Sequence, residues 1–115
     1  MNVIIALGSN YQQAVHIHWA SQRLTTLLHG IRFSRILWTQ DIHGTGVYYM
    51  NRLATGSTTL SSDVLIQILK DIETEAGRSE NHVTIDLDLM QFGDKYYHKN
   101  DWPRPYIQQL IPDIK

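Results

Sequence analysis

Two aspartates, Asp86 and Asp88, are the residues whose type and spacing most directly suggest chemistry. They alternate with apolar residues in the run TIDLDLM, a pattern typical of a half-buried strand. Side chains two positions apart on a strand share a face, so we expect the carboxylates side by side. Neighbouring carboxylates repel each other unless a cation lies between them, and Mg²⁺ prefers oxygen ligands. The pair therefore predicts a site for metal-bound phosphate, the alternative being two solvated acids on a strand surface.

The composition of the chain limits the other possibilities. Its 115 residues are 43% hydrophobic and 18% charged with a net charge of -1, which predicts one globular domain over residues 1–115. There is no basic excess for nucleic acid, and the absence of cysteine excludes disulfides and thiolate metal sites. No apolar run approaches the roughly 20 residues of a membrane span, and the N-terminus has no signal-peptide pattern. We expect a cytoplasmic protein without nucleic-acid or membrane partners.

Hydrophobic periodicity predicts the elements that position the two acids. Apolar runs predict strands at residues 3–7, 31–39, 48–55 and 84–92. Apolar residues at helical spacing predict helices over 14–28 and 65–76, which we expect to stop at Gly30 and Gly77. The order β-α-β-β-α-β is typical of an α+β, ferredoxin-like fold, an antiparallel sheet with two helices on one face. The aromatic tail after residue 93 is expected to be ordered, with Trp102 as an anchor.

Four segments of the chain resemble a single family. They are ALGSN at 6–10, YMN at 49–51, Ile72-Glu73 followed by Gly77-Arg78, and IDLDLMQFG at 85–93. Over nearly its whole length the sequence is similar to hydroxymethyldihydropterin pyrophosphokinases. The resemblance implies the same ferredoxin-like fold. It also implies ATP- and magnesium-dependent transfer of pyrophosphate to 6-hydroxymethyl-7,8-dihydropterin in folate biosynthesis, with release of AMP.

The resemblance further implies roles for individual residues. Asp86 and Asp88 match acids that hold a pair of Mg²⁺ ions against the phosphates of ATP, and Arg78 matches a catalytic position at the edge of a loop. The residues that match the pterin pocket are Thr39, Ile42, Tyr49, Asn51 and Tyr106. The residues that match positions near the nucleotide are Glu73, His98 and Arg104. The implied partners are the pterin and ATP.

Some of these residues also have an ordinary structural interpretation. Tyr49 and Asn51 would then be plain strand residues, Gly8 a turn glycine, and Arg78 a cation near a helix C-terminus. Each alternative stays open at the level of sequence.

The chain departs from the family pattern in the loop before the acidic strand. Family members carry there a long loop with several arginines and a tryptophan, ending in an arginine three residues before the first acid. Here Ser79 to Ile85 contain neither residue type, and Val83 stands at the position of that last arginine. His82 could replace the lost charge only in part, because its charge depends on pH.

Loss of these arginines leaves three hypotheses open, since one such arginine can be worth roughly three to five powers of ten in rate. The first is a pyrophosphokinase with a contracted catalytic loop. The second is a pterin- or nucleotide-binding relative without catalysis. The third is an interaction domain on a ferredoxin-like scaffold, because a fold alone does not specify a function.

Overall fold

The apolar runs and stripes of the sequence form an antiparallel sheet flanked by helices. The computed structural model describes residues 1–40, 46–77, 79 and 82–115, and these contain a six-stranded sheet and three helices. The elements are β1 (Asn2–Ser9), α1 (Gln13–Leu27), β2 (His29–Phe33), β3 (Leu37–Gln40), β4 (Tyr48–Ser57), α2 (Ser62–Glu75), β5 (Asp86–Phe92), β6 (Lys95–Tyr96) and α3 (Pro105–Ile114). None of the helices within these ranges is long and apolar enough to cross a membrane.

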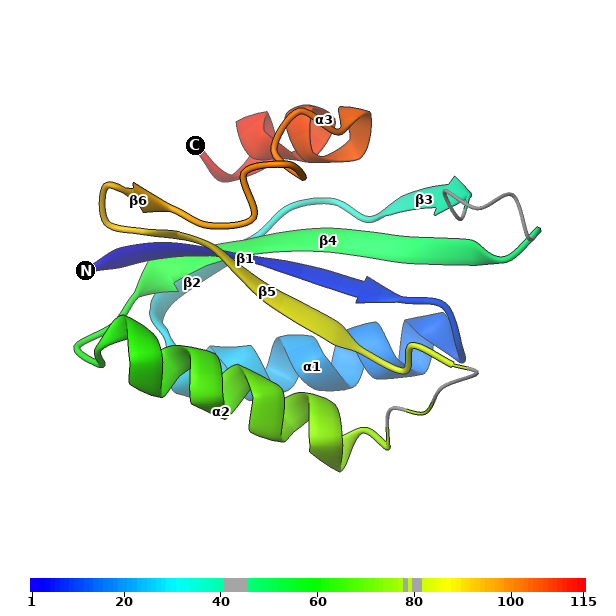
Figure 1. Cartoon of the computed structure of the whole chain (residues 1–115), viewed down its shortest axis with the longest axis horizontal. Coiled ribbons are helices and arrows are strands. Elements are labelled where there is room, and N and C mark those ends of the chain that lie inside the picture. The colour runs from blue at the N-terminus through cyan, green and yellow to red at the C-terminus, as the bar shows by residue number, and fades with distance from the viewer. Residues whose placement is uncertain (41–45, 78, 80–81) are drawn as a thin grey trace.

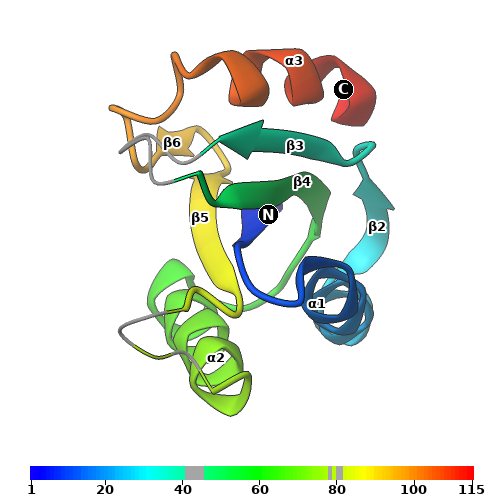
Figure 2. The ribbon, with the colours of Figure 1, turned by 90° about the vertical axis from the view of Figure 1, so that its right-hand side faces the viewer.

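The strand order confirms the expected ferredoxin-like fold. The strands are arranged β2-β4-β1-β5-β6, and β3 pairs with the same strand, β4, as β2 does. The central strand β1 runs antiparallel to both of its neighbours, β4 and β5. Helices α1 and α2 cover one face of the sheet, and α3 covers the other (Figures 1 and 2).

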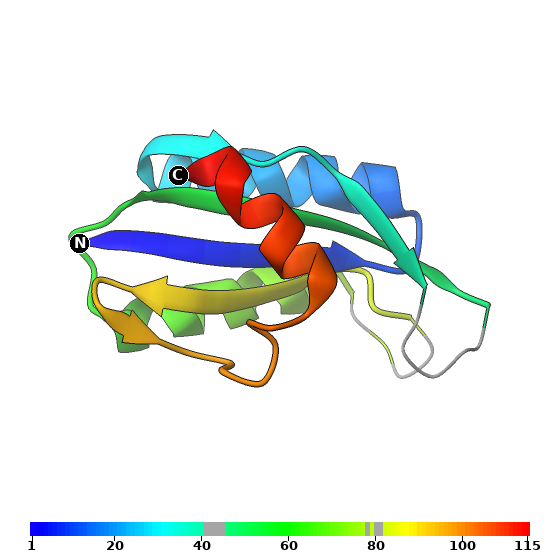
Figure 3. The same cartoon turned by 90° about the horizontal axis from the view of Figure 1, so that it is seen from above.

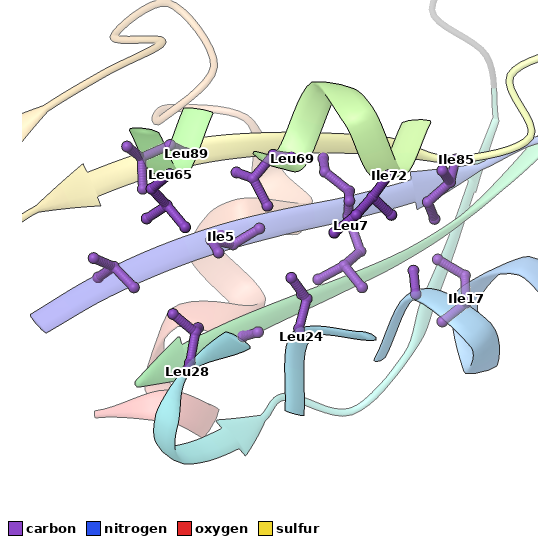
Figure 4. Packing of buried hydrophobic residues seen from close by; sticks show 14 of the residues in the cluster. Ile5, Leu7, Ile17, Leu24, Leu28, Leu65, Leu69, Ile72, Ile85 and Leu89 are labelled. Carbon is purple, nitrogen blue, oxygen red and sulfur yellow. The ribbon is translucent and has the colours of Figure 1, made fainter. Parts of the chain in front are cut away.

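Strand β1 supplies side chains to two separate cores. Ile5 and Leu7 pack with Leu24 of α1 and Leu69 of α2 on one face of the sheet (Figure 4). Ile4 packs on the opposite face in a smaller core that includes residues of α3. Burial on both faces explains why the start of the sequence is a continuous apolar run rather than an alternating one. Each fully buried aliphatic side chain contributes about 1.5–3 kcal/mol to stability.

The predicted second strand, 31–39, is interrupted in the structure. Ser34 separates β2 from β3: its backbone N–H donates to the Leu53 carbonyl at 2.9 Å, and its hydroxyl oxygen accepts from the Leu53 N–H at 2.8 Å. A side-chain oxygen thus replaces a backbone carbonyl in the ladder, and the chain bends there.

The two predicted helix stops have different outcomes. Gly77 follows Ala76, the C-cap of α2, and has a φ of 77°, as a glycine stop requires, so the prediction is confirmed. The prediction for Gly30 is wrong, because α1 ends earlier and Gly30 lies in β2 with a φ of 60°, where the β2–β4 register shifts.

The C-terminal tail forms a helix that the sequence analysis did not predict. Helix α3 begins with Pro105 in its first turn, where a missing N–H costs nothing, and buries Ile107, Leu110 and Ile114 against the sheet. Trp102 precedes it and packs against the same core while its indole N–H donates to the Tyr97 carbonyl at 2.9 Å. The expectation that Trp102 anchors the tail is confirmed.

Candidate functional site

Strand pairing brings an amide and two carboxylates to one face of the sheet. Gly8 of β1 lies opposite Asn51 of β4 on one side and opposite Asp86 of β5 on the other. Ala6, two residues earlier on β1, lies opposite Asp88. Paired residues on adjacent strands share a face, and here it is the face on which α3 packs (Figure 3).

The start of α3 forms one side of an open cavity of about 600 Å³ in this region, a size typical of small-molecule sites. Of the residues matched to the family's site, those that line the cavity are Thr39, Tyr49, Asn51, Asp86, Asp88, Arg104 and Tyr106. The other lining residues are Ala6, Leu7, Gly8, Gln40, Asp101 and Pro105. Residues distant in the sequence therefore meet around one space, at the end of the sheet where β1 finishes and α3 begins.

Asn51 is a buried amide whose orientation is set by its neighbours. Its Nδ2 donates to the Leu37 carbonyl at 3.2 Å, to the Thr39 hydroxyl at 2.8 Å and to the Tyr49 carbonyl at 3.4 Å. Carbonyl oxygens can only accept, so the NH₂ group must face them and Oδ1 must face the other way. A methyl group added at Gly8 would lie 3.6 Å from that Oδ1, which places the amide oxygen over Gly8 at the cavity wall.

The two acids provide part of a coordination shell for a hard cation. Asp86 and Asp88 are half-buried, and both line the cavity. Within the described ranges no group of three or more His, Cys, Asp or Glu could enclose a metal. Mg²⁺ commonly takes only one or two carboxylates and completes its shell with phosphate oxygens and water. The acidic pair fits a metal that arrives with phosphates better than a metal held by protein alone.

A cationic side chain, that of Arg104, lines the same cavity as the acidic pair. Arg104 immediately precedes α3, and its Nε is 3.1 Å from Oδ1 of Asp101 in an i,i+3 pair. Asp101 lines the cavity but was not predicted as a site residue, although an acid three residues before an arginine in a turn was a usable signal. The charged residues that line the cavity are three acids, Asp86, Asp88 and Asp101, and one base, Arg104. The local charge is therefore negative and favours binding of cations before polyanions.

Tyr106 forms a neutral part of the wall. Burial is the largest cause that raises the pKa of its phenol above the ordinary value. Arg104 acts in the opposite direction on this pKa, and nearby Asp101, Asp88 and Asp86 add to the increase. The ring therefore presents an uncharged aromatic surface at neutral pH.

Four matched residues lie outside this cavity wall or outside the described chain. Glu73 is on α2, and its Oε2 accepts a hydrogen bond from the Leu87 N–H at 2.7 Å. His98 is not a lining residue, but its Nε2 is 3.7 Å from Oδ1 of Asp88. Ile42 and Arg78 fall outside the residues that the structure describes. The roles of these four residues stay predictions, as do those of the matched residues that line the cavity.

The fold and the cavity together define a class of protein, an α+β domain of ferredoxin-like topology whose small-molecule cavity combines an acidic pair with amide and aromatic walls. The chain belongs to the 7,8-dihydro-6-hydroxymethylpterin-pyrophosphokinase family, whose sequence model matches residues 4–114. It is also 32% identical over 129 aligned positions to a folate synthesis bifunctional protein of Arabidopsis thaliana. That alignment covers 97% of this chain but 26% of the relative, so the chain spans about a quarter of the relative's length.

Proposed function

We propose that this protein transfers pyrophosphate from ATP to the hydroxymethyl group of 6-hydroxymethyl-7,8-dihydropterin in a magnesium-dependent reaction of folate biosynthesis, releasing AMP. Family membership supports a transferase of the pyrophosphokinase type. The observation that carries the proposal is that the acidic pair lines the same cavity as four of the matched pterin-pocket residues, Thr39, Tyr49, Asn51 and Tyr106. These residues come from four elements, β3, β4, β5 and α3. Residues 1–115 act as a single domain in this proposal.

The amide and hydroxyl groups of the cavity suit the polar edge of a pterin. Asn51 directs its Oδ1 away from three protein acceptors, so it can accept a hydrogen bond from the pterin's amino group. The Thr39 oxygen accepts from Asn51, which leaves the hydroxyl proton of Thr39 for a ring acceptor of the pterin. The rings of Tyr49 and Tyr106 supply aromatic walls for the flat heterocycle.

The acidic end of the cavity suits the transferred phosphates. Asp86 and Asp88 would hold Mg²⁺, which when bound neutralises phosphate charge and orients the phosphates. In the reaction, the pterin's hydroxymethyl oxygen bonds to the β-phosphorus of ATP. The bond from that phosphorus to the oxygen bridging α and β breaks, AMP leaves with that oxygen, and the hydroxyl proton passes to a carboxylate or to water. The Arg104 guanidinium adds positive charge where negative charge moves.

A second candidate function is pterin binding without transfer. The observation that favours it is the segment from Ser79 to Ile85, which contains no arginine. Among the described cavity residues, Arg104 alone is cationic and it is already paired with Asp101. Neutralisation of a bound triphosphate would therefore depend more on metal ions here than in a protein whose loop carries arginines.

Calorimetric titration with 6-hydroxymethylpterin distinguishes these functions. The titration is run with protein alone, with Mg²⁺, and with Mg²⁺ plus a non-hydrolysable ATP analogue. Tighter pterin binding in the third arm supports the pyrophosphokinase. Pterin binding that is indifferent to nucleotide and metal supports the binding protein, and no binding by a folded sample would contradict both.

A further inference from the structure

Asn10 connects the short segment before β5 to the wall of the cavity. Its backbone N–H donates to the Val83 carbonyl at 2.9 Å, and its side-chain Oδ1 accepts from the Val83 N–H at 2.7 Å. Its Nδ2 donates to the hydroxyl oxygen of Tyr49 at 3.2 Å, and Tyr49 lines the cavity. One side chain thus contacts both the segment and the site.

Elementary hydrogen-bond chemistry fixes the direction of these contacts. The Val83 N–H can only donate, so the oxygen of the Asn10 amide must face Val83. The NH₂ group then faces Tyr49, and the phenol oxygen of Tyr49 is the acceptor. Rotation of the amide by half a turn would break the bond to Val83, so Val83 determines which group Asn10 offers to Tyr49.

The segment itself is held against the turn after β1 by further contacts. The ring of His82 stacks on the ring of Tyr11 with 3.9 Å between centroids and 23° between planes. The Ser9 hydroxyl donates to the Tyr11 carbonyl at 3.2 Å and lies 3.5 Å from the Val83 carbonyl. Residues 82–83 are therefore docked on residues 9–11, in the part of the chain where family members carry their long loop.

We propose that Asn10 is a positioning residue that makes this docked segment part of the pterin site. A tyrosine ring swings about its first side-chain bond, and a hydrogen bond to the phenol oxygen at its far end fixes the direction in which the ring points. Asn10 supplies that bond to Tyr49, and Val83 holds Asn10 in the required orientation. This inference rests on the proposed function, because the ring it orients is a wall for the pterin. A correctly placed wall lowers the cost of binding, because less freedom is lost when the ligand arrives.

A double-mutant cycle on pterin binding tests the proposal. The dissociation constant of 6-hydroxymethylpterin is measured by calorimetry for the wild type, Asn10→Ala, Tyr49→Phe and the double variant. We expect each single change to weaken binding by about five- to tenfold, as for loss of one hydrogen bond. The double variant should bind no more weakly than the worse single one, because both changes remove the same contact. Effects that multiply instead would overturn the proposal.

Gln13→Ala is the matched control. Gln13 follows the same turn and donates from Nε2 to the Tyr48 carbonyl at 3.1 Å, so it also ties this region to β4, but it does not line the cavity. Its replacement should leave pterin affinity unchanged. Thermal unfolding of every variant separates a loss of positioning from a loss of stability. If Asn10→Ala lowers the unfolding temperature but leaves pterin affinity unchanged, a positioning role is refuted.

Tyr49→Phe carries the test if Asn10→Ala does not fold. It removes the same hydrogen bond from the other side and leaves the contacts between Asn10 and Val83 in place. We expect Tyr49→Phe to weaken pterin binding by about five- to tenfold without a matching loss of stability. If the wild type binds no pterin, the proposed function and this inference both fail. If the wild type binds pterin while Tyr49→Phe matches it, this inference alone fails.

Discussion

The amide nitrogen of Asn51 donates a hydrogen bond to the hydroxyl oxygen of Thr39 at 2.8 Å, joining β4 to the edge strand β3 at the cavity wall. Because the Thr39 oxygen is an acceptor in this bond, its proton points elsewhere. The pair therefore offers a ligand one acceptor, Asn51 Oδ1, and one donor, the Thr39 hydroxyl. This combination matches the alternating groups of a pterin edge.

Thr39→Val should weaken pterin binding with little effect on folding. Asn51 keeps its bonds to the Leu37 and Tyr49 carbonyls, so the free energy of unfolding should fall by about 1 kcal/mol or less. The dissociation constant should rise by about five- to tenfold through loss of the donor. Thr55→Val is the control. Thr55 lies on β4, as Asn51 does, and its hydroxyl donates to the Val3 carbonyl on β1. Equal pterin affinity in the two variants would contradict the assignment.

Gly8→Ala should fold normally and lose affinity for pterin. The φ of Gly8 is not in the left-handed region, and a methyl group there would make ordinary contacts, 3.6 Å from Asn51 Oδ1 and 3.9 Å from Tyr49 Cδ1. It would nevertheless occupy the cavity wall and press on a ligand at that wall. Calorimetry should show at least about tenfold weaker binding with an unchanged unfolding temperature. Unchanged affinity would place the ligand elsewhere.

Asp86→Asn and Asp88→Asn should each abolish the magnesium dependence of nucleotide binding. A neutral amide keeps the shape of the site but removes charge that a hard cation requires. Pterin binding without nucleotide should persist, and AMP release should fall by about 100-fold or more, since several kcal/mol of charge stabilisation are lost. Asp94→Asn, in the exposed turn between β5 and β6, is the control. Chelation of Mg²⁺ should reproduce the variants in the wild type.

Arg104→Lys should lower kcat for AMP release more than it changes pterin affinity. Arg104 uses its Nε toward Asp101, and the planar guanidinium keeps two further nitrogens for the cavity. A lysine ammonium cannot hold Asp101 and reach phosphate with the same geometry. We expect kcat to fall by about tenfold or more. Arg35→Lys, whose arginine pairs with the remote Asp113, should leave kcat unchanged.

The shared face of the two acids could be predicted because it depends on a local signal. The pterin-pocket roles came from the family resemblance, and they stay predictions. Alternation in TIDLDLM fixes the face of Asp86 and Asp88 whatever the rest of the chain does. The break at Ser34 could not be predicted, because it depends on a hydroxyl that meets Leu53 across the sheet. The hydrogen bond that Glu73 accepts could not be predicted either, because the donor is the backbone N–H of Leu87 on β5, a contact made only in the folded chain.

Helix α3 is a different case, because its signal was present and was missed. Ile107, Leu110 and Ile114 recur at helical spacing and form one buried stripe. The prolines of this segment do not prevent the helix, because Pro105 lies in the first turn and Pro112 near the end, where they are tolerated. Packing against the sheet then stabilises helix α3, which local helix propensity alone would not.

Tyr106 should make the protein less stable at alkaline pH. Burial raises the pKa of its phenol above the unfolded value of about 10, so between the two values the native state keeps a proton that the unfolded state has lost. The stability that the neutral Tyr106 phenol contributes is fully present below the pKa of the phenol in the unfolded state. It is lost as pH rises through the pKa of the phenol in the folded state. Urea unfolding should show a steeper decline above about pH 10 for the wild type than for Tyr106→Phe. Parallel declines would contradict the burial of this phenol.

Release of AMP from ATP by the wild-type protein, measured with 6-hydroxymethyl-7,8-dihydropterin and with or without Mg²⁺, tests the central claim most directly. The proposed pyrophosphokinase releases one AMP for each pterin diphosphate formed, only when pterin and Mg²⁺ are both present. A folded protein that binds the pterin but releases no AMP under these conditions would contradict the claim.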